Sequence, residues 1–206
     1  MTIVIAEGRG VRVSRSSTPS RERIVVGAAD MISRRGLSAT SIRETAKHAQ
    51  APLGSTYHCF PEGKQQPASE AVRHTGDRMA RSLRKELGAG PAAGLDAFLA
   101  LWWEIVVDTD FHAGCPVLAV AVEEPPADEV PPALAAAAEV FELWEGLLAD
   151  SLRAHGAEAG RAAQIATLVV AAVEGAVAMC RAKRGTDPLD RTAARLRALI
   201  ADAIGD

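Results

Sequence analysis

The sequence predicts an all-α protein, and three observations lead to this expectation. Alanine, the residue with the highest helix propensity, occupies 41 of the 206 positions. Only eight residues are aromatic, and the β-branched and aromatic runs that strands prefer are few. Apolar residues recur at intervals of three and four along much of the chain, which is the period of an amphipathic helix.

The first 19 residues differ in composition from the rest. They mix Gly, Arg, Ser, Thr and Pro without apolar periodicity, so we expect a disordered basic tail over residues 1–19. Its six initial, mostly apolar residues are too few for a signal-peptide core. The longest apolar run, Ile165–Cys180, has 16 residues and contains Glu174, which is short of the roughly 20 residues that cross a bilayer. We therefore expect a cytoplasmic protein with no membrane segment.

A first helix is expected over residues 21–35. Ser20 stands at its N-cap position, and Gly36 stands where a glycine commonly ends a helix. The apolar positions between them recur at helical spacing: Ile24, Ala28, Met31 and Ile32.

A second helix is expected over residues 41–49, because Ser41 and Glu44 have the capping-box spacing. Pro52 interrupts this helix but suits the first turn of a third one, Pro52–Cys59.

A break at residues 60–63 then precedes a long helix that begins at Lys64 and runs to about Leu87. This order of elements, a helix followed by two short helices with a three-residue turn between them, is typical of a helix-turn-helix motif. We therefore expect a three-helix DNA-binding domain over residues 20–66 and a helical body over residues 67–206.

The charge distribution agrees with this division. Residues 1–66 contain ten Lys or Arg and five Asp or Glu, whereas residues 67–206 contain thirteen and twenty-one. A basic segment joined to an acidic body indicates that one end approaches a polyanion such as double-stranded DNA. The alternative is that the arginines of the tail cause the asymmetry; without residues 1–19 the segment keeps seven basic and four acidic residues.

A series of short motifs makes the comparison with a known family specific. It consists of Gly36, Thr40-Ser41, Ile42-Arg43-Glu44-Thr45-Ala46, Gly54-Ser55-Thr56-Tyr57-His58-Cys59-Phe60 and Gly63-Lys64. The series resembles the DNA-binding domain of the TetR family of ligand-responsive transcriptional repressors. Further along, GCPVLAVAVEE at residues 114–124 resembles the start of the central helices in the LmrA/YxaF-like branch of that family.

The resemblance implies a DNA-binding role for nine residues. Those for phosphate positioning are Thr40, Ser41, Arg43, Tyr57 and Lys64, and those for the groove floor are Leu53, Ser55, Thr56 and His58. It also implies a repressor that binds a palindromic operator as a dimer and is released by a small molecule.

Four positions depart from the family pattern: Thr45, Gln50, Thr56 and Cys59. Thr45 replaces a buried aliphatic residue, Gln50 the turn glycine, Thr56 a Leu or Phe, and Cys59 a Tyr or His that touches phosphate. A left-handed conformation at Gln50 costs about 1–2 kcal/mol. The departures leave an alternative open, namely a helical ligand-binding protein of the same fold that has lost specific DNA binding.

Five helices are expected in the rest of the body from its apolar pattern and its Pro and Gly breaks: Leu95–Asp108, Pro116 to Val122, Ala133–Ala154, Glu158–Arg184 and Pro188–Ile204. The last carries an apolar stripe, and the one before it carries small residues such as Ala172 and Gly175. Such faces need to be covered by another helix. The resemblance implies a homodimer through these last two helices, and an intramolecular bundle is the alternative.

The resemblance also implies an effector site in the body, with apolar and aromatic walls and a few polar groups. The wall candidates are Trp102, Trp103, Val106, Phe111, Leu118, Trp144, Leu148 and Met179, each of which could instead be a core residue. The polar candidates are His112 and Glu174, because unpartnered polar groups in apolar segments are costly; Glu174 could instead pair at the dimer seam. The expected effector is hydrophobic or aromatic.

An enzyme is the main rival class. A catalytic cysteine needs a base and an orienting partner, yet neither Cys115 with His112 nor Cys59 with His58 has a recognisable third member. The sequence has no glycine-rich phosphate loop, and its five histidines are scattered. We therefore expect no catalysis, no cofactor and no metal site.

Overall fold

The protein is described by a computed structural model that covers residues 20–124 and 130–205, and these residues form nine α-helices and no β-strand. The expected all-α fold is confirmed. The predicted disordered tail at residues 1–19 lies outside the described residues. In chain order the helices are α1 (Ser20–Arg35), α2 (Ile42–His48), α3 (Leu53–Cys59), α4 (Gln65–Leu87), α5 (Pro91–Asp108), α6 (Pro116–Ala121), α7 (Pro132–Ala154), α8 (Ala159–Lys183) and α9 (Asp187–Ile204).

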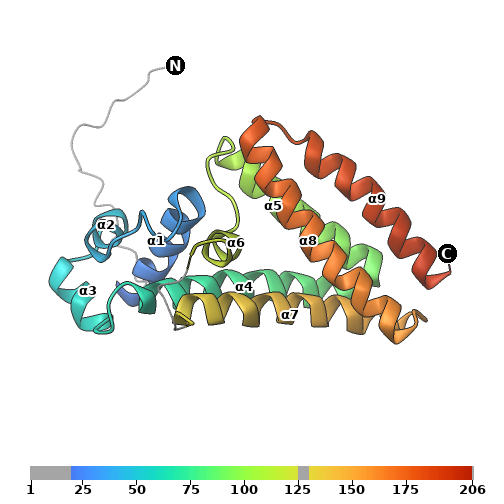
Figure 1. Ribbon diagram of the computed structural model, residues 1–206, viewed down its shortest axis with the longest axis horizontal. Coiled ribbons are helices and arrows are strands. Elements are labelled where there is room, and N and C mark those ends of the chain that lie inside the picture. Colours follow the sequence, from blue (N-terminus) through green and yellow to red (C-terminus); the bar gives the residue numbers. More distant parts are fainter. Residues whose placement is uncertain (1–19, 125–129, 206) are drawn as a thin grey trace, which may run out of the picture.

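The molecule is elongated along α4 and α7, which run side by side (Figure 1). Helices α1–α3, which we call the head, lie at one end. Helices α4–α9, which we call the body, extend from the head to the opposite end, where the C-terminus lies. Helix α6 lies beside α1, α4 and α7, between the head and the rest of the body.

The predicted helices agree with the observed ones to within one residue at each end, except that α5 begins at Pro91 rather than Leu95. Pro91 occupies the first turn of α5, after Gly90 with φ +115°. Gly94 lies inside this helix, where an added Cβ would lie 2.1 Å from the Leu87 side chain, so that side chain would have to move.

Two positive φ angles shape the head. Gly36 has φ +79° and its N–H donates to the Ile32 carbonyl, so it ends α1 as predicted. Gln50 has φ +51°, which confirms that the turn between α2 and α3 needs the left-handed conformation. The head therefore carries the strain of a non-glycine residue at this position.

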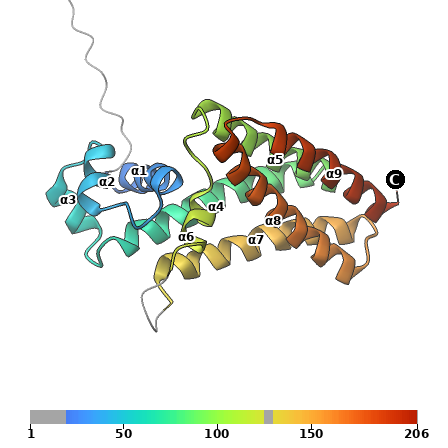
Figure 2. The ribbon, with the colours of Figure 1, turned by 45° about the horizontal axis from the view of Figure 1, so that its top comes forward.

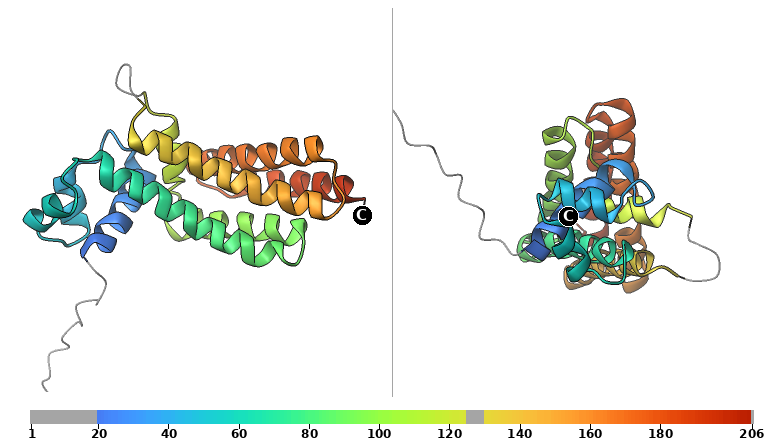
Figure 3. Two further views of the ribbon diagram at one scale, coloured as in Figure 1. Left: turned by 90° about the horizontal axis from the view of Figure 1, so that it is seen from below. Right: turned by 90° about the vertical axis from the view of Figure 1, so that its left-hand side faces the viewer.

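Helices α4 and α7 pack closely at Gly76. A Cβ at this position would lie 2.4 Å from a methyl group of Val140, so only glycine fits without movement. The Trp144 Nε1–H of α7 donates to the Gly76 carbonyl at 3.1 Å. Figure 3 shows the two helices aligned along the length of the molecule.

Helix α8 lies between α7 and α9 (Figure 2). By length and composition alone it is the one helix of residues 20–124 and 130–205 that could cross a membrane. Half of its apolar window is buried inside the protein, as is usual for a central helix of a bundle. A single hydrophobic core extends from α1 to α9, and the division of the chain at residue 66 stays a prediction.

Candidate nucleic-acid interface and effector region

Local hydrogen bonds hold both ends of α2: after its last residue, the Gln50 N–H donates to the Lys47 carbonyl at 3.2 Å and the Ala51 N–H to the Ala46 carbonyl at 2.9 Å, and the bonds at its start come from Ser41. The Ser41 hydroxyl accepts from the Glu44 N–H at 3.2 Å and donates to the Glu44 carboxylate at 2.8 Å, which confirms the predicted cap. Pro52 precedes α3 in an extended conformation, as the N-cap residue. Ala49 lies against Gly27 of α1, where an added Cβ would approach it to 3.1 Å. A small residue at each position lets α1 and α2 approach closely.

Most of the predicted DNA-contacting residues lie at the surface of the head. Tyr57 is 52% exposed, and Leu53 is half-buried. The others at the surface are Ser41, Arg43, Ser55, His58 and Lys64. These residues belong to α2, α3 and the segments that flank them, and Ser55, Tyr57 and His58 share the short α3.

Two of the nine predictions need correction. Thr56 is fully buried and its hydroxyl donates to the Pro52 carbonyl at 3.1 Å, so it packs α3 against the rest of the head and does not face a groove. Thr40 is also buried, with its hydroxyl bonded to the Gly36 carbonyl at 2.8 Å. Both hydroxyl groups can be buried because each donates a hydrogen bond to the backbone carbonyl four residues earlier.

Arg21 holds α3 in place and was not predicted to do so. Its guanidinium donates to the Cys59 carbonyl at 2.7 Å, forms an ion pair with Glu70 of α4, and lies 4.7 Å from the centre of the Phe60 ring. The partners are 38 and 49 residues away along the chain, so no local pattern could identify them. Cys59 thus contributes its backbone to the orientation of α3.

The C-terminal end of α1 is hydrogen-bonded to the body. The Gly114 N–H donates to the Ser33 carbonyl at 3.0 Å. Arg181 of α8 donates to the Arg34 and His112 carbonyls, both at 3.1 Å. The last carbonyls of α1, which lack helical partners, are therefore satisfied by groups from the body.

A second connection joins the loop after α1 to the end of α6. The Glu123 carboxylate accepts from the Ser38 N–H at 2.9 Å and from the Ser38 hydroxyl at 2.7 Å. A Cβ at Gly36 would lie 2.7 Å from the same carboxylate, so glycine at this position also leaves room for Glu123. Movement of α6 or α8 would therefore act directly on the head.

The predicted effector residues divide into a buried and an exposed group. Trp102, Val106, Trp144, Leu148 and Glu174 are buried, and Phe111 and Leu118 are partly buried. Trp102 and Trp144 meet edge to face, with centroids 6.4 Å apart, and Phe98 contacts both. These aromatic side chains fill the interior between α5 and α7.

Trp103, His112 and Met179 lie at the surface, which corrects their prediction as walls of an interior site. Trp103 is 44% and Met179 49% exposed. The His112 side chain is 61% exposed, 3.9 Å from the Asp110 carboxylate. It follows Asp110 and Phe111, whose φ angles of +49° and +58° lie in the left-handed region.

Glu174 is a buried carboxyl group without a hydrogen-bond partner of normal geometry among the described residues, and the Trp102 indole N–H is in the same situation. Burial raises the pKa of Glu174 from 4.5 to about 8, and an interaction with the Cys115 thiol acts in the opposite direction. Burial, followed by the charge of Glu174, raises the pKa of Cys115 well above its ordinary value. Both groups are therefore neutral near pH 7, and Cys115 is not an activated nucleophile.

Among residues 20–124 and 130–205, no group of three or more His, Cys, Asp or Glu side chains is arranged to hold a metal ion.

Comparison with known proteins places the chain among transcriptional regulators. Residues 91–195 match the family model described as the C-terminal domain of LmrA/YxaF-like transcriptional regulators. An uncharacterised HTH-type transcriptional regulator of Mycobacterium tuberculosis is 39% identical over 183 residues, which cover 87% of this chain and 93% of that protein. LmrA of Bacillus subtilis, an HTH-type transcriptional regulator, is 30% identical over 172 residues, which cover 82% and 90%.

Solved structures share the fold. A TetR transcriptional regulator from Legionella pneumophila has a TM-score of 0.77 at 18% identity, covering 88% of this chain and 97% of that one. The regulatory protein TetR from Rhodobacter sphaeroides has a TM-score of 0.76 at 22% identity, covering 88% and 99%.

Proposed function

Because the chain belongs to the TetR family of transcriptional regulators, with an LmrA/YxaF-like C-terminal domain, we propose that it is a repressor that binds a palindromic operator as a homodimer and is released by a hydrophobic or aromatic small molecule. It is a transcriptional regulator and not an enzyme. As a repressor it would act in the cytoplasm, where the chromosome of a bacterium lies.

The observation that carries the proposal is the exposed surface of α3. Ser55, Tyr57 and His58 are exposed, while the packing of Thr56 and the bonds of Arg21 hold the helix against α1 and α4. A rigid short helix with polar and aromatic side chains can enter a major groove, while Arg43 and Lys64 contact phosphates on either side.

An apolar surface on α8 supports the homodimer. Leu168 and Met179 are exposed and lie eleven residues apart, which is three helical turns, so they share one face. The residues exposed or partly exposed between them are small: Ala171, Ala172, Gly175 and Ala178. A second copy covering this face and the neighbouring surface of α9 would give a dimer with two α3 helices, which a palindromic operator requires to lie about 34 Å apart or a multiple of that distance.

The unpartnered polar groups of the body support an interior effector site. Trp102 offers a hydrogen-bond donor, and Glu174, neutral near pH 7, offers both a donor and acceptors. A ligand that bonded to either group would remove the cost of an unmade buried hydrogen bond, about 1–3 kcal/mol each. Since both groups are buried, the ligand would bind a more open arrangement of α5–α8.

The contacts of Arg181 and Glu123 with the head would transmit that opening. A ligand that prefers the open body shifts the population of conformers by its differential affinity. Because α8 and α6 are hydrogen-bonded to the end of α1 and to Ser38, the head would move with them, and the spacing of the two α3 helices would change.

The test is selection of binding sites from a randomised duplex library with the purified full-length protein, followed by titration of the selected duplex at several salt concentrations. We expect a palindromic sequence and an affinity that falls steeply with salt. Tyr57→Ala should weaken binding tenfold or more while leaving thermal stability unchanged, because the side chain is half exposed.

Two lysines provide a matched pair of variants. Lys64→Ala should lower the slope of log K against log salt by about 1.8 per dimer, from one lost phosphate contact in each copy. Lys85→Ala, an exposed lysine at the far end of α4, should leave the slope unchanged. Selection of no sequence would refute the proposal in favour of a regulator fold that no longer reads DNA, and equal slopes for the two variants would remove Lys64 from the DNA interface.

A further inference from the structure

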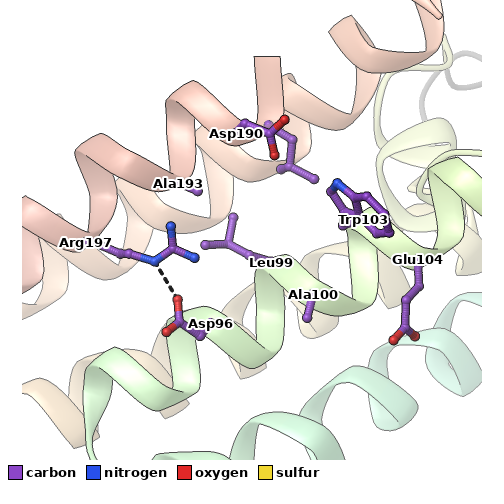
Figure 4. A pocket seen from close by; sticks show the side chains of 9 residues that line it. Asp96, Leu99, Ala100, Trp103, Glu104, Asp190, Ala193 and Arg197 are labelled. Carbon is purple, nitrogen blue, oxygen red and sulfur yellow. Dashed lines mark hydrogen bonds and ion pairs between the residues drawn. The ribbon is translucent and has the colours of Figure 1, made fainter. Parts of the chain in front are cut away.

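A surface groove lies between α5 and α9, apart from the buried aromatic cluster of Phe98, Trp102 and Trp144 (Figure 4). Its volume is about 500 Å³, within the range of roughly 300–1000 Å³ that is usual for small-molecule sites. Leu99 of α5 and Ala193 of α9 contribute apolar surface. The groove can therefore accept a compound of one or two rings.

Trp103 supplies the largest apolar surface in this groove. It is the exposed member of the three tryptophans, since Trp102 and Trp144 are fully buried. An indole ring presents a π face with negative potential, to which organic cations are attracted. The groove thus contains a recognition surface for an aromatic or cationic group.

The charged groups of the groove are mostly acidic. Arg197 Nε donates to the Asp96 carboxylate at 2.7 Å, so these two side chains neutralise each other. Asp190 and Glu104 form no ion pair with any residue in the described part of the chain. Figure 4 shows Asp190 at the same end of the groove as Trp103, while the Glu104 carboxylate points away from the indole.

We propose that this groove binds an aromatic organic cation. Its ring stacks on Trp103, and its positive group lies between the indole and the Asp190 carboxylate. An indole face and a carboxylate each favour a cation over a neutral or anionic compound of the same shape. The site is separate from the interior effector region, and its occupancy does not depend on DNA binding.

The proposed dimer leaves this groove open. On α9, Asp190, Ala193 and Arg197 lie on one face, at steps of three and four residues. Arg195 and Leu199 lie on the opposite face, which forms a second groove with Leu168 of α8. A second copy packed on the Leu168 side would therefore not cover Trp103.

Calorimetric titration of the full-length protein with three naphthalene compounds of similar shape tests the proposal. The compounds are (2-naphthylmethyl)trimethylammonium, neutral 2-naphthylmethanol and anionic 2-naphthylacetate. We expect the ammonium compound to bind at least about tenfold more tightly than the other two, and its affinity to fall with added salt. Equal binding of the three compounds would overturn the proposal.

Variants locate the binding site. Trp103→Ala and Asp190→Asn should each weaken binding of the ammonium compound by about five- to tenfold, whereas Trp103→Phe should retain most of it. Two controls change similar residues elsewhere: Leu168→Ala, an exposed apolar residue of α8, and Glu142→Gln, an exposed acid of α7. An equal loss in the controls, or undiminished binding by Trp103→Ala in a folded protein, would refute the assignment.

Discussion

The head and the body accommodate buried polar groups in different ways. In the head, Ser33, Thr40, Thr45 and Thr56 are buried, and each hydroxyl donates to a backbone carbonyl three or four residues earlier at 2.8–3.1 Å. In the body, the Ser69 hydroxyl of α4 is satisfied in the same way by the Gln66 carbonyl at 3.0 Å. The Trp102 indole N–H and the Glu174 carboxyl group, however, are buried without a hydrogen-bond partner of normal geometry among the described residues.

The difference shows in which region the buried polar groups already have all their hydrogen bonds. A hydroxyl that bonds to its own segment is satisfied as soon as the local backbone forms, so these buried groups of the head do not depend on how the body is arranged. An unpaired indole N–H or carboxyl group deep in the body raises the free energy of the closed state. We therefore infer that a ligand would change the conformation of the body more than that of the head, because it could form the missing hydrogen bonds.

The largest effect is expected at Glu174. Its folded pKa of about 8 lies above the ordinary value of 4.5, so between these values the folded state holds one more proton than the unfolded state. Stability therefore falls as the pH rises through this window, by up to about 1.4 kcal/mol per pH unit. Glu174→Gln removes this loss of stability, so the free energy of unfolding of the variant minus that of the wild type should grow from pH 5 to pH 8.

Urea unfolding of both proteins at pH 5, 6, 7 and 8 measures this advantage. The exposed Glu142→Gln serves as the control and should follow the wild type at every pH. A constant difference between Glu174→Gln and the wild type would show that the buried carboxyl group finds a partner in solution.

An intermediate effect is expected at Gln50 in the head. Gln50→Gly relieves a left-handed strain of about 1–2 kcal/mol, offset by about 0.5–1 kcal/mol of extra chain entropy in the unfolded state. The net gain of about 0.5–1 kcal/mol should raise the melting temperature by about 1–4 °C. Gln164→Gly, in the second turn of α8, should instead destabilise the protein by about 1 kcal/mol. Equal shifts for the two variants would contradict the strain at Gln50.

The smallest effect is expected at Thr56. Thr56→Val removes the hydroxyl bond to the Pro52 carbonyl, which keeps its bond from the Thr56 N–H at 3.1 Å. The free energy of unfolding should change by less than about 1 kcal/mol, and affinity for the selected operator should stay within threefold, because the side chain is buried. A larger loss of affinity without a loss of stability would return Thr56 to the DNA interface.

The helices were predictable to within one residue, with α5 as the exception, because their ends depend on local chemistry. Ser41, Pro52 and Gly36 act on neighbouring backbone groups, so their roles follow from spacing alone. The functional surfaces were less predictable. Thr40 and Thr56 belong to motifs that indicate DNA contact, yet the tertiary packing of the head buries both side chains. Arg21 acts through partners tens of residues away.

The sequence by itself determined an all-α chain with a helix-turn-helix head, since helix propensity, caps and apolar spacing are properties of short segments. The tertiary structure decided which polar groups lack partners and which residues face solvent. Trp102 and Trp103 illustrate the limit: adjacent residues of α5 point about 100° apart, and an apolar sequence on all sides does not say which points inward. The packing of α5 against its neighbours buries Trp102 and leaves Trp103 in the groove beside α9.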